Sequence, residues 1–221
     1  MRVLLATSNP GKIAELTREL VALDLEVIGL ESLSLSDVIS GEIIETGSTF
    51  GENALLKARY YFEKSGLVTI ADDSGIEVDA LKGRPGIYSA RYAGPNATDA
   101  QRTGHLLEEM SGVASDLRGA RFVCAAAIVW SHGEKVFEGD VRGRILTEAR
   151  GSGGFGYDPV FYYPPLGRTF AELSHEEKWL VSHRGRAFRS LARWLSEAGT
   201  LVDTNGSGDR INDPAKNSRL L

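Results

Sequence analysis

The chain has 221 residues, of which 42% are hydrophobic and 25% are charged, so it is long enough for one large domain or two small lobes with a substantial core. Its formal net charge of -5 argues against DNA or RNA as the main partner, because proteins that bind them usually carry a basic excess. The single cysteine, Cys124, excludes an internal disulfide and a multi-cysteine metal cluster, and its apolar neighbours indicate a core thiol. We expect neither a membrane span nor a signal peptide, and we expect the protein in the cytoplasm.

A strand is predicted at residues 2–6, followed by a polar loop at 7–12 and a helix. The helix is indicated by apolar residues at helical spacing, namely Ile13, Leu16, Leu20 and Leu23. A strand, a glycine-containing loop and a helix in this order can bring backbone N–H groups to a phosphate, and Lys12 adds a positive charge. The spacing is not that of a Walker loop, and an ordinary helix-capping turn is the alternative.

A second strand is predicted at 25–30, then an acidic, irregular segment at 33–47 that carries Glu42 and Glu45. The next helix, at 49–64, has an apolar stripe formed by Phe50, Ala54, Ala58 and Phe62. Asn53 and Lys57 are four residues apart and therefore share a helix face beside that stripe. Lys57 either lies on a solvated face or points toward a phosphate.

Two adjacent carboxylates, Asp72 and Asp73, follow the apolar, β-branched run at 67–70, which predicts a buried strand. The two charges repel each other and lose water as the strand end is covered. A divalent cation would relieve both costs, and Ser74 and Gly75 predict a turn that would hold the pair. An ordinary surface turn is the alternative.

The middle of the chain predicts a short strand at 76–78, a turn at 83–86 and a loop at 88–92 that borders the site. Thr98 and Gln101 form a capping box that begins a helix. Strands are predicted at 121–130, 135–140 and 142–147.

Residues 151–159 contain the pattern G-x-G-x-x-G, but a strand-like run at 160–163 follows in place of a helix, so we reject a dinucleotide-binding loop. A glycine loop that presents Phe155 and Tyr157 suits a planar base, because stacking a base on an aromatic ring is worth about 1–3 kcal/mol. The alternative is a glycine-rich hairpin with core aromatics.

The capping box of Ser174 and Glu177 begins a helical turn that bears Lys178, and residues 182–185 interrupt it. A final amphipathic helix follows. We predict a single domain over residues 1–200 and a disordered tail at 201–221, which is rich in Asn, Asp, Gly and Ser.

Seven short motifs occur in order along most of the chain and resemble the Ham1-like inosine/xanthosine triphosphate pyrophosphatases, a family of nucleotide hydrolases. The motifs are TSNPGK at 7–12, ETGSTFGENA at 45–54, ADDSG at 71–75, PGIYSARY at 85–92, GGFGYDP at 153–159, EEK at 176–178 and SHRG at 182–185. The resemblance implies an elongated mixed α/β fold, with flanking helices and two lobes around a central cleft, and a homodimer.

The resemblance also implies the roles of the site residues. Asp73 is the proton acceptor, and Glu45 and Asp73 hold Mg²⁺ with Asp72 nearby. The triphosphate is bound by Thr7, Ser8, Asn9, Pro10, Gly11 and Lys12, and Lys57 faces the phosphates. The nucleotide is contacted by Ser74, Phe155, Gly156, Tyr157, Asp158, Lys178, His183 and Arg184.

The expected reaction converts a purine nucleoside triphosphate such as dITP or XTP and water to the monophosphate and pyrophosphate. Hydrogen-bond donors near Tyr157 or from the pair His183-Arg184 would favour a base with a carbonyl at C6. Three alternatives stay open: a noncatalytic nucleotide sensor, a Maf-like pyrophosphatase for other modified bases, and a two-carboxylate glycosidase. The glycosidase leaves the lysines and the first loop unexplained.

Overall fold

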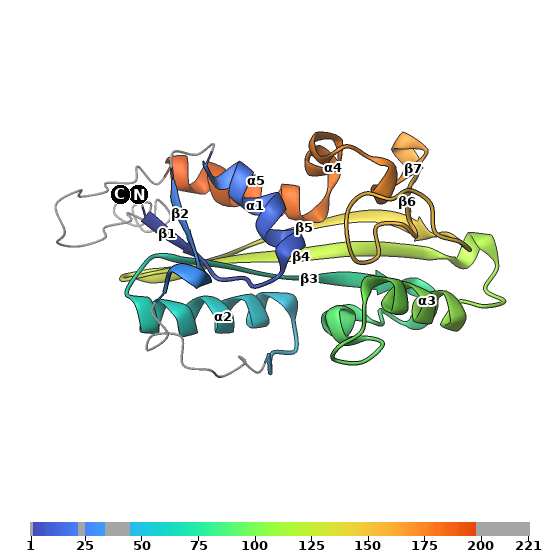
Figure 1. Cartoon of the computed structure of the whole chain (residues 1–221), viewed down its shortest axis with the longest axis horizontal. Coiled ribbons are helices and arrows are strands. Elements are labelled where there is room, and N and C mark those ends of the chain that lie inside the picture. Colours follow the sequence, from blue (N-terminus) through green and yellow to red (C-terminus); the bar gives the residue numbers. More distant parts are fainter. Residues whose placement is uncertain (1, 22–24, 34–44, 198–221) are drawn as a thin grey trace, which may run out of the picture. The chain divides into compact units, whose positions relative to one another are not determined.

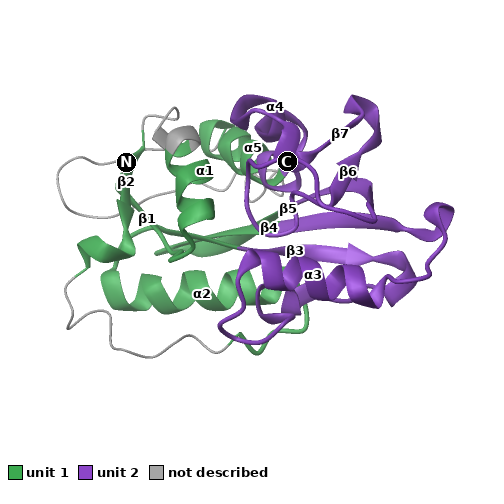
Figure 2. Cartoon of the chain, turned by 45° about the vertical axis from the view of Figure 1, so that its right-hand side comes forward, with its two compact units in different colours: residues 1–72, 125–137, 187–221 green, residues 73–124, 138–186 purple. Residues whose placement is uncertain are grey.

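The computed structural model of the chain describes residues 2–21, 25–33 and 45–197. The chain divides into two compact units (Figure 2). Unit 1 comprises residues 1–72, 125–137 and 187–221, and unit 2 comprises 73–124 and 138–186. Leu23, Glu42 and the predicted tail at 201–221 lie outside the described residues, and the single domain over 1–200 stays a prediction.

Within the described residues, a mixed sheet of seven strands, in the order β2-β1-β3-β4-β5-β6-β7, forms the framework of the fold (Figure 1). The strands are β1 (Arg2–Leu5), β2 (Glu26–Gly29), β3 (Thr69–Val78), β4 (Gly119–Trp130), β5 (Gly133–Ile145), β6 (Phe161–Tyr163) and β7 (Arg168–Thr169). β1 pairs in parallel with β2 and β3, whereas β6 pairs antiparallel with β5 and β7. The mixed sheet and its flanking helices confirm the predicted α/β class.

In unit 1, α1 (Pro10–Val21) and α5 (His183–Glu197) lie on one face of the strands and α2 (Phe50–Ser65) lies on the other (Figures 1 and 2). α5 begins in unit 2 and continues into unit 1 from Ala187. The predicted stripe of α2 is buried at Phe50, Ala54 and Ala58. Thr49 caps α2, because its side chain accepts a hydrogen bond from the Glu52 N–H group. Local sequence signals therefore fix this helix as predicted.

In unit 2, α3 (Asp99–Glu109) and α4 (His175–Val181) both begin with the predicted capping boxes. The core of the unit is apolar and aromatic, and its largest members include Ile76, Leu106, Met110, Phe161 and Phe170. The rings of Phe122 and Phe161 lie 4.6 Å apart between centroids. This packing stabilises the segments that carry the polar residues described below.

The structure bears on three of the predictions made from the sequence. Cys124 is buried, as predicted for a core thiol. The two strands predicted at 135–140 and 142–147 are one continuous strand, β5, since Val141 is buried and the intervening residues keep an extended conformation. Among the described residues, no helix is both long and apolar enough to cross a membrane.

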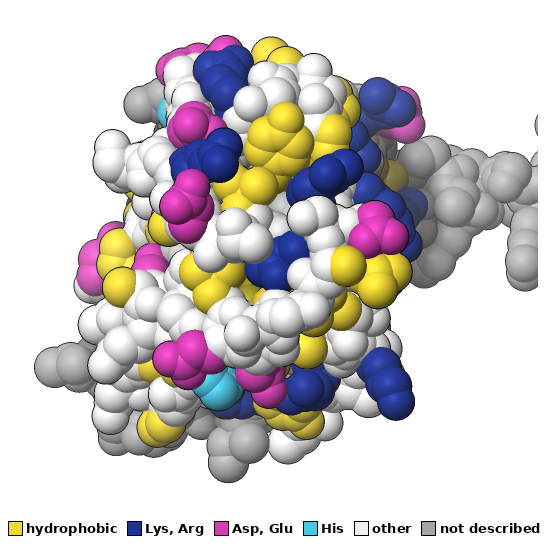
Figure 3. All heavy atoms as spheres, turned by 90° about the vertical axis from the view of Figure 1, so that its right-hand side faces the viewer, with side chains coloured by type: hydrophobic (Ala, Val, Ile, Leu, Met, Phe, Trp, Pro, Cys, Tyr) yellow, Lys and Arg dark blue, Asp and Glu magenta, His cyan; other side chains and the backbone are white. Residues whose placement is uncertain are grey.

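Acidic and basic side chains are interspersed with hydrophobic ones on the face shown in Figure 3.

Candidate active site

The predicted acidic pair lies within β3 rather than at its end. Residues 69–78 form one strand, so the predicted turn at Ser74-Gly75 and the separate strand at 76–78 are wrong. The pairing between β1 and β3 does end nearby, with Leu5 opposite Ile70, while β3 continues beside β4. Successive residues of a strand point to opposite faces, and so the buried side chains of Asp72 and Asp73 are directed to different faces of β3.

Lys12 and Asp72 form an ion pair in unit 1, with Lys12 Nζ 2.9 Å from Asp72 Oδ2. Parallel neighbouring strands end at the same edge of a sheet, and this brings the segment after β1 to the segment of β3 that follows Ile70. The Asp72 side chain is fully buried and that of Lys12 is 13% exposed. The pair therefore places a partly accessible ammonium group beside a buried carboxylate.

The segment between β1 and α1 is shorter than predicted, because α1 begins at Pro10. Pro10 to Lys12 are the first turn of the helix, where proline is favoured since its missing N–H would have no helical partner. Asn9 caps the helix, and its Oδ1 atom accepts a hydrogen bond from the Lys12 N–H group at 3.1 Å. The predicted order of strand, loop and helix is therefore present, and the loop ends in a helix-capping turn at Asn9.

Lys57 of α2 pairs with Glu45, with Lys57 Nζ 2.8 Å from Glu45 Oε1. One helical turn earlier, Asn53 Oδ1 accepts a hydrogen bond from the Gly47 N–H group at 2.8 Å. A Cβ atom at Gly47 would lie 2.6 Å from Asn53 Oδ1, so this close approach requires glycine. Asn53 and Lys57 together hold the segment that carries Glu45. The sequence placed Asn53 on this helix face but gave it no role.

The carboxylates predicted as metal ligands have ordered partners of their own. Asp72 and Glu45 pair with lysines, and Asp73 Oδ1 accepts a hydrogen bond from the Ser74 N–H group at 3.0 Å. Within the described ranges, no group of three or more His, Cys, Asp or Glu side chains is arranged to hold a metal ion. Carboxylate oxygens nevertheless suit Mg²⁺, which commonly binds one or two carboxylates together with substrate phosphates. A metal held by Glu45 and Asp73, with Asp72 nearby, stays a prediction.

In unit 2, Asp158 is buried and fixes the glycine-rich loop. Its Oδ2 atom lies 2.6 Å from Lys178 Nζ and accepts a hydrogen bond from the Phe155 N–H group at 2.8 Å. Gly154 has φ +69°, and a Cβ atom there would lie 2.1 Å from Asp158 Oδ2. The loop therefore needs glycine at this position both for its backbone conformation and for the close approach of the carboxylate.

Two cations lie close to the ring of Phe155. Lys178 Nζ is 4.8 Å and the Arg184 guanidinium carbon is 5.4 Å from its centroid. Arg184 Nη2 also donates a hydrogen bond to Ser74 Oγ at 2.8 Å. The structure thus brings together five of the predicted contact residues, Ser74, Phe155, Asp158, Lys178 and Arg184.

Two other predicted contact residues pack inside unit 2. The ring of His183 stacks on Phe122, with centroids 4.7 Å apart and planes 9° apart. Tyr157 is buried, and its hydroxyl group donates a hydrogen bond to the Ser89 carbonyl oxygen at 2.9 Å. Burial raises the pKa of Tyr157 far above its ordinary value. The expectation that Tyr157 presents its ring to a base is therefore wrong, and the alternative of a core aromatic is correct at this position.

Comparison with known proteins identifies the same group of relatives by sequence and by structure. The model of the Ham1 family matches residues 3–194. The chain is 50% identical over 192 residues to a dITP/XTP pyrophosphatase of Thermus thermophilus, covering 86% of this chain and 90% of that protein. It is 48% identical over 201 residues to a dITP/XTP pyrophosphatase of Photorhabdus laumondii, covering 89% of this chain and 99% of the other.

Solved structures agree with the sequence comparison. The Ham1 protein of Staphylococcus aureus superposes with a TM-score of 0.79 at 41% identity, covering 89% of this chain and 99% of that one. A nucleoside-triphosphatase / dITP/XTP pyrophosphatase from Mycobacterium abscessus superposes with a TM-score of 0.70 at 45% identity, covering 86% and 98%. The likeness extends over nearly all of the described residues.

Proposed function

This chain belongs to the Ham1 family, and we propose that it hydrolyses the non-standard purine nucleotides dITP, ITP, XTP and dXTP to the monophosphate and pyrophosphate. The relatives that carry the name dITP/XTP pyrophosphatase are about half identical to it over most of both chains. Removal of such nucleotides from the precursor pool is the physiological role that follows.

The observation that carries the proposal is the ion pair between Lys12 and Asp72 at the start of α1. A lysine in the first turn of a helix adds its charge to the positive end of the helix dipole, and together they suit a polyphosphate. We assign phosphate binding to the segment Thr7, Ser8, Asn9, Pro10, Gly11 and Lys12, and to Lys57. The lysines would offset the negative charge that develops on the departing pyrophosphate.

Asp73 is the proposed proton acceptor. Water attacks the α-phosphorus, the bond from that phosphorus to the oxygen bridging the α- and β-phosphates breaks, and Asp73 takes the proton of the water. The Ser74 N–H group that donates to Asp73 Oδ1 fixes the orientation of the carboxylate. An oriented carboxylate can hold the water in line with the bond that breaks.

We also propose that a divalent cation, Mg²⁺, is held by Glu45 and Asp73, whose carboxylate oxygens suit it, with Asp72 nearby on β3. When bound, it supplies positive charge that neutralises the polyphosphate. Because Asp72 and Glu45 also pair with lysines, each carboxylate orients a lysine whether or not a cation is present. The chain itself thus supplies both anionic and cationic groups for the phosphates.

Base recognition is assigned to residues of unit 2. Phe155 offers an aromatic ring, and Arg184, held by Ser74, offers guanidinium donors that suit the C6 carbonyl of hypoxanthine or xanthine. Gly156, Tyr157, Asp158 and Lys178 shape the loop that carries Phe155. A contact between His183 and the base stays a prediction.

We further propose a homodimer in the cytoplasm that acts on free nucleotides, with neither nucleic acid nor membrane as a partner. The negative net charge supports a small-molecule substrate over a nucleic acid. Analytical ultracentrifugation of the purified chain tests the dimer.

The decisive experiment is a panel of purified nucleotides with Mg²⁺, in which monophosphate and pyrophosphate are quantified for each. We expect dITP, ITP and XTP to be hydrolysed much faster than ATP, and one pyrophosphate to appear for each monophosphate. Binding of ITP without any pyrophosphate would indicate a noncatalytic sensor. Preference for a modified pyrimidine would indicate a Maf-like activity.

A further inference from the structure

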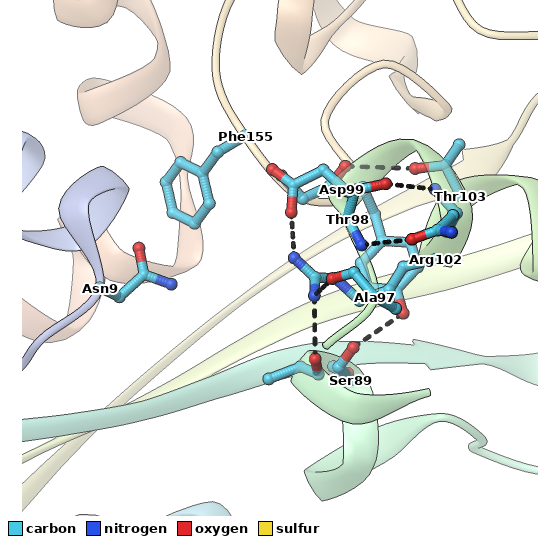
Figure 4. Close-up of polar contacts among 12 residues, drawn as sticks. Asn9, Ser89, Ala97, Thr98, Asp99, Arg102, Thr103 and Phe155 are labelled. Atoms are coloured by element: carbon cyan, nitrogen blue, oxygen red, sulfur yellow. Dashed lines mark hydrogen bonds and ion pairs between the residues drawn. The ribbon is translucent and has the colours of Figure 1, made fainter. Parts of the chain in front are cut away.

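The glycine-rich loop is hydrogen-bonded to α3, a helix for which we predicted no role in the site. Asp99, in the first turn of α3, accepts a hydrogen bond from the Gly156 N–H group at 2.7 Å through its Oδ2 atom. Thr103 Oγ1 donates to the Gly156 carbonyl oxygen at 3.2 Å. Residues four apart on a helix lie on the same face, so one face of α3 holds both polar groups of Gly156 (Figure 4).

A second charged residue of α3 fixes the Asp99 carboxylate. Arg102 forms an ion pair with Asp99 Oδ1, which leaves Oδ2 directed at the Gly156 N–H group. The guanidinium of Arg102 is itself anchored, because it donates to the carbonyl oxygens of Ala90, at 3.1 Å, and Ala97 (Figure 4). The carboxylate is therefore oriented by contacts outside the loop, and it does not depend on the loop for its position.

The loop requires such an external constraint. Gly156 has φ +62° and would find open space around an added Cβ atom, so its glycine serves backbone conformation and not packing. Glycine loses more conformational freedom on ordering than other residues, and contacts must compensate for that loss. Two carboxylates do so at consecutive amides, since Asp158 accepts from Phe155 N–H and Asp99 accepts from Gly156 N–H.

We propose that Asp99, with Arg102 and Thr103, is a positioning residue that fixes the glycine-rich loop so that Phe155 is oriented to stack on the purine base. The inference rests on the proposed function, because it assigns the base to Phe155. The proposal gives Asp99 no contact with the nucleotide. A purely structural role, favourable interaction of an acidic residue with the positive end of α3, is the competing explanation.

The test compares Asp99→Ala with Glu109→Ala, a matched variant at the other end of the same helix that removes an ion pair with Arg84 and a hydrogen bond from the Tyr92 hydroxyl group. Loss of a charged hydrogen bond predicts that Asp99→Ala raises KM for dITP about tenfold and changes kcat less than about threefold. Asp99→Asn keeps only one oxygen for two donors, Arg102 and the Gly156 N–H group, so it should raise KM less than Asp99→Ala does. Glu109→Ala keeps the KM of the wild-type enzyme.

Two further readouts separate positioning from stability. Hydrogen exchange of the free protein is expected to speed up at residues 151–159 in Asp99→Ala and in Thr103→Val, but not in Glu109→Ala. Inhibition by inosine should weaken in Asp99→Ala while inhibition by pyrophosphate stays unchanged, because the loop is assigned to the base. If Asp99→Ala does not fold, the same measurements are made on Thr103→Val instead.

A wild-type KM and unchanged exchange in Asp99→Ala, or equal effects of the two alanine variants, would overturn the inference. Failure of the proposed function has a different signature, namely no pyrophosphate released from dITP by the wild-type enzyme. The exchange measurement needs no activity and therefore reports on the loop in either case.

Discussion

The two units use the same kinds of side chain in different ways. In unit 1, the pairs Lys12–Asp72 and Lys57–Glu45 each join a helix lysine to one carboxylate, and the lysine side chains are 13% and 16% exposed. In unit 2, Lys178 of the pair Lys178–Asp158 is more deeply buried than either of those lysines, and Asp158 also binds the loop backbone. We propose that the lysines of unit 1 present positive charge to a ligand, whereas the unit 2 pair determines the shape of a loop.

This difference predicts two classes of variant. Loss of a unit 1 residue should affect every nucleotide alike, because all triphosphates carry the same phosphates. Loss of a unit 2 residue that carries or fixes the glycine-rich loop should affect nucleotides according to their base, whereas loss of Asp73, the first residue of unit 2, should affect all nucleotides alike. Measurements on ITP and ATP side by side therefore test the comparison directly.

The largest effect is expected from Asp73→Asn. Without a proton acceptor, kcat should fall about 10³-fold, within the range typical of general base catalysis, while the protein stays folded. Pyrophosphate release and circular dichroism give the two measurements. Asp79→Asn, a change to an exposed acid that follows the same strand and pairs with Arg142, is the matched control. Near-normal turnover in Asp73→Asn would remove Asp73 from the mechanism.

The next largest effect is expected from Lys12→Gln, which keeps a hydrogen-bond donor for the buried Asp72 but removes the charge. Loss of one charged group aimed at the phosphates should lower kcat/KM about 10²-fold, by a similar factor for ITP and ATP. Lys64→Gln, near the end of α2, serves as the control. A loss confined to ITP would contradict the proposed difference between the two units, because it would make Lys12 a base-selecting residue.

A smaller and selective effect is expected from Arg184→Ala. Loss of a guanidinium donor to the C6 carbonyl should raise KM for ITP about tenfold and leave turnover of ATP nearly unchanged. Arg186→Ala removes an exposed arginine from the same helix, whose guanidinium donates to the Asp140 carbonyl oxygen, and controls for general effects. Equal changes on both nucleotides would contradict a base-reading role for Arg184.

Local signals predicted most of the elements, and long-range contacts account for what was missed. The capping boxes at Thr98 and Ser174 act within one helical turn and were identified correctly. Ser74-Gly75 favours a turn locally, but neighbouring strands keep the residues in β3, since strand preference depends strongly on context.

Contacts beyond the local sequence also explain why we did not predict roles for Asp99 and Asn53. Asp99 is ordinary in the first turn of a helix, and only the fold shows that Gly156 lies against it. Asn53 likewise gains its role from Gly47. The assignment of phosphate binding to the segment from Thr7 to Lys12 stays a prediction, which could be made because its residues are contiguous, whereas Tyr157 was misjudged because its partner, Ser89, is distant in sequence.

The smallest effect is expected from an ion pair of unit 1 that has no assigned role in the site. Arg59 and Glu134 pair through two hydrogen bonds, with side chains 48% and 37% exposed. Exposed pairs contribute about 0.2–1 kcal/mol, since solvent screens them. Glu134→Gln should therefore lower the free energy of unfolding in urea by no more than about 1 kcal/mol and leave kcat/KM unchanged.

The hydrogen bond from Arg59 lowers the pKa of Glu134 below its ordinary value of 4.5. A carboxylate whose folded-state pKa is lowered stabilises the protein above its unfolded-state pKa, and this contribution is lost as pH falls through the folded-state pKa. The stability difference between wild type and Glu134→Gln should thus be constant near neutral pH and shrink below pH 4.5. A difference that grows toward acid pH would contradict the lowered pKa of Glu134. A change in kcat/KM would show that this exposed pair acts like those proposed at Lys12 and Lys57, and exposure would then fail to separate functional from structural pairs in unit 1.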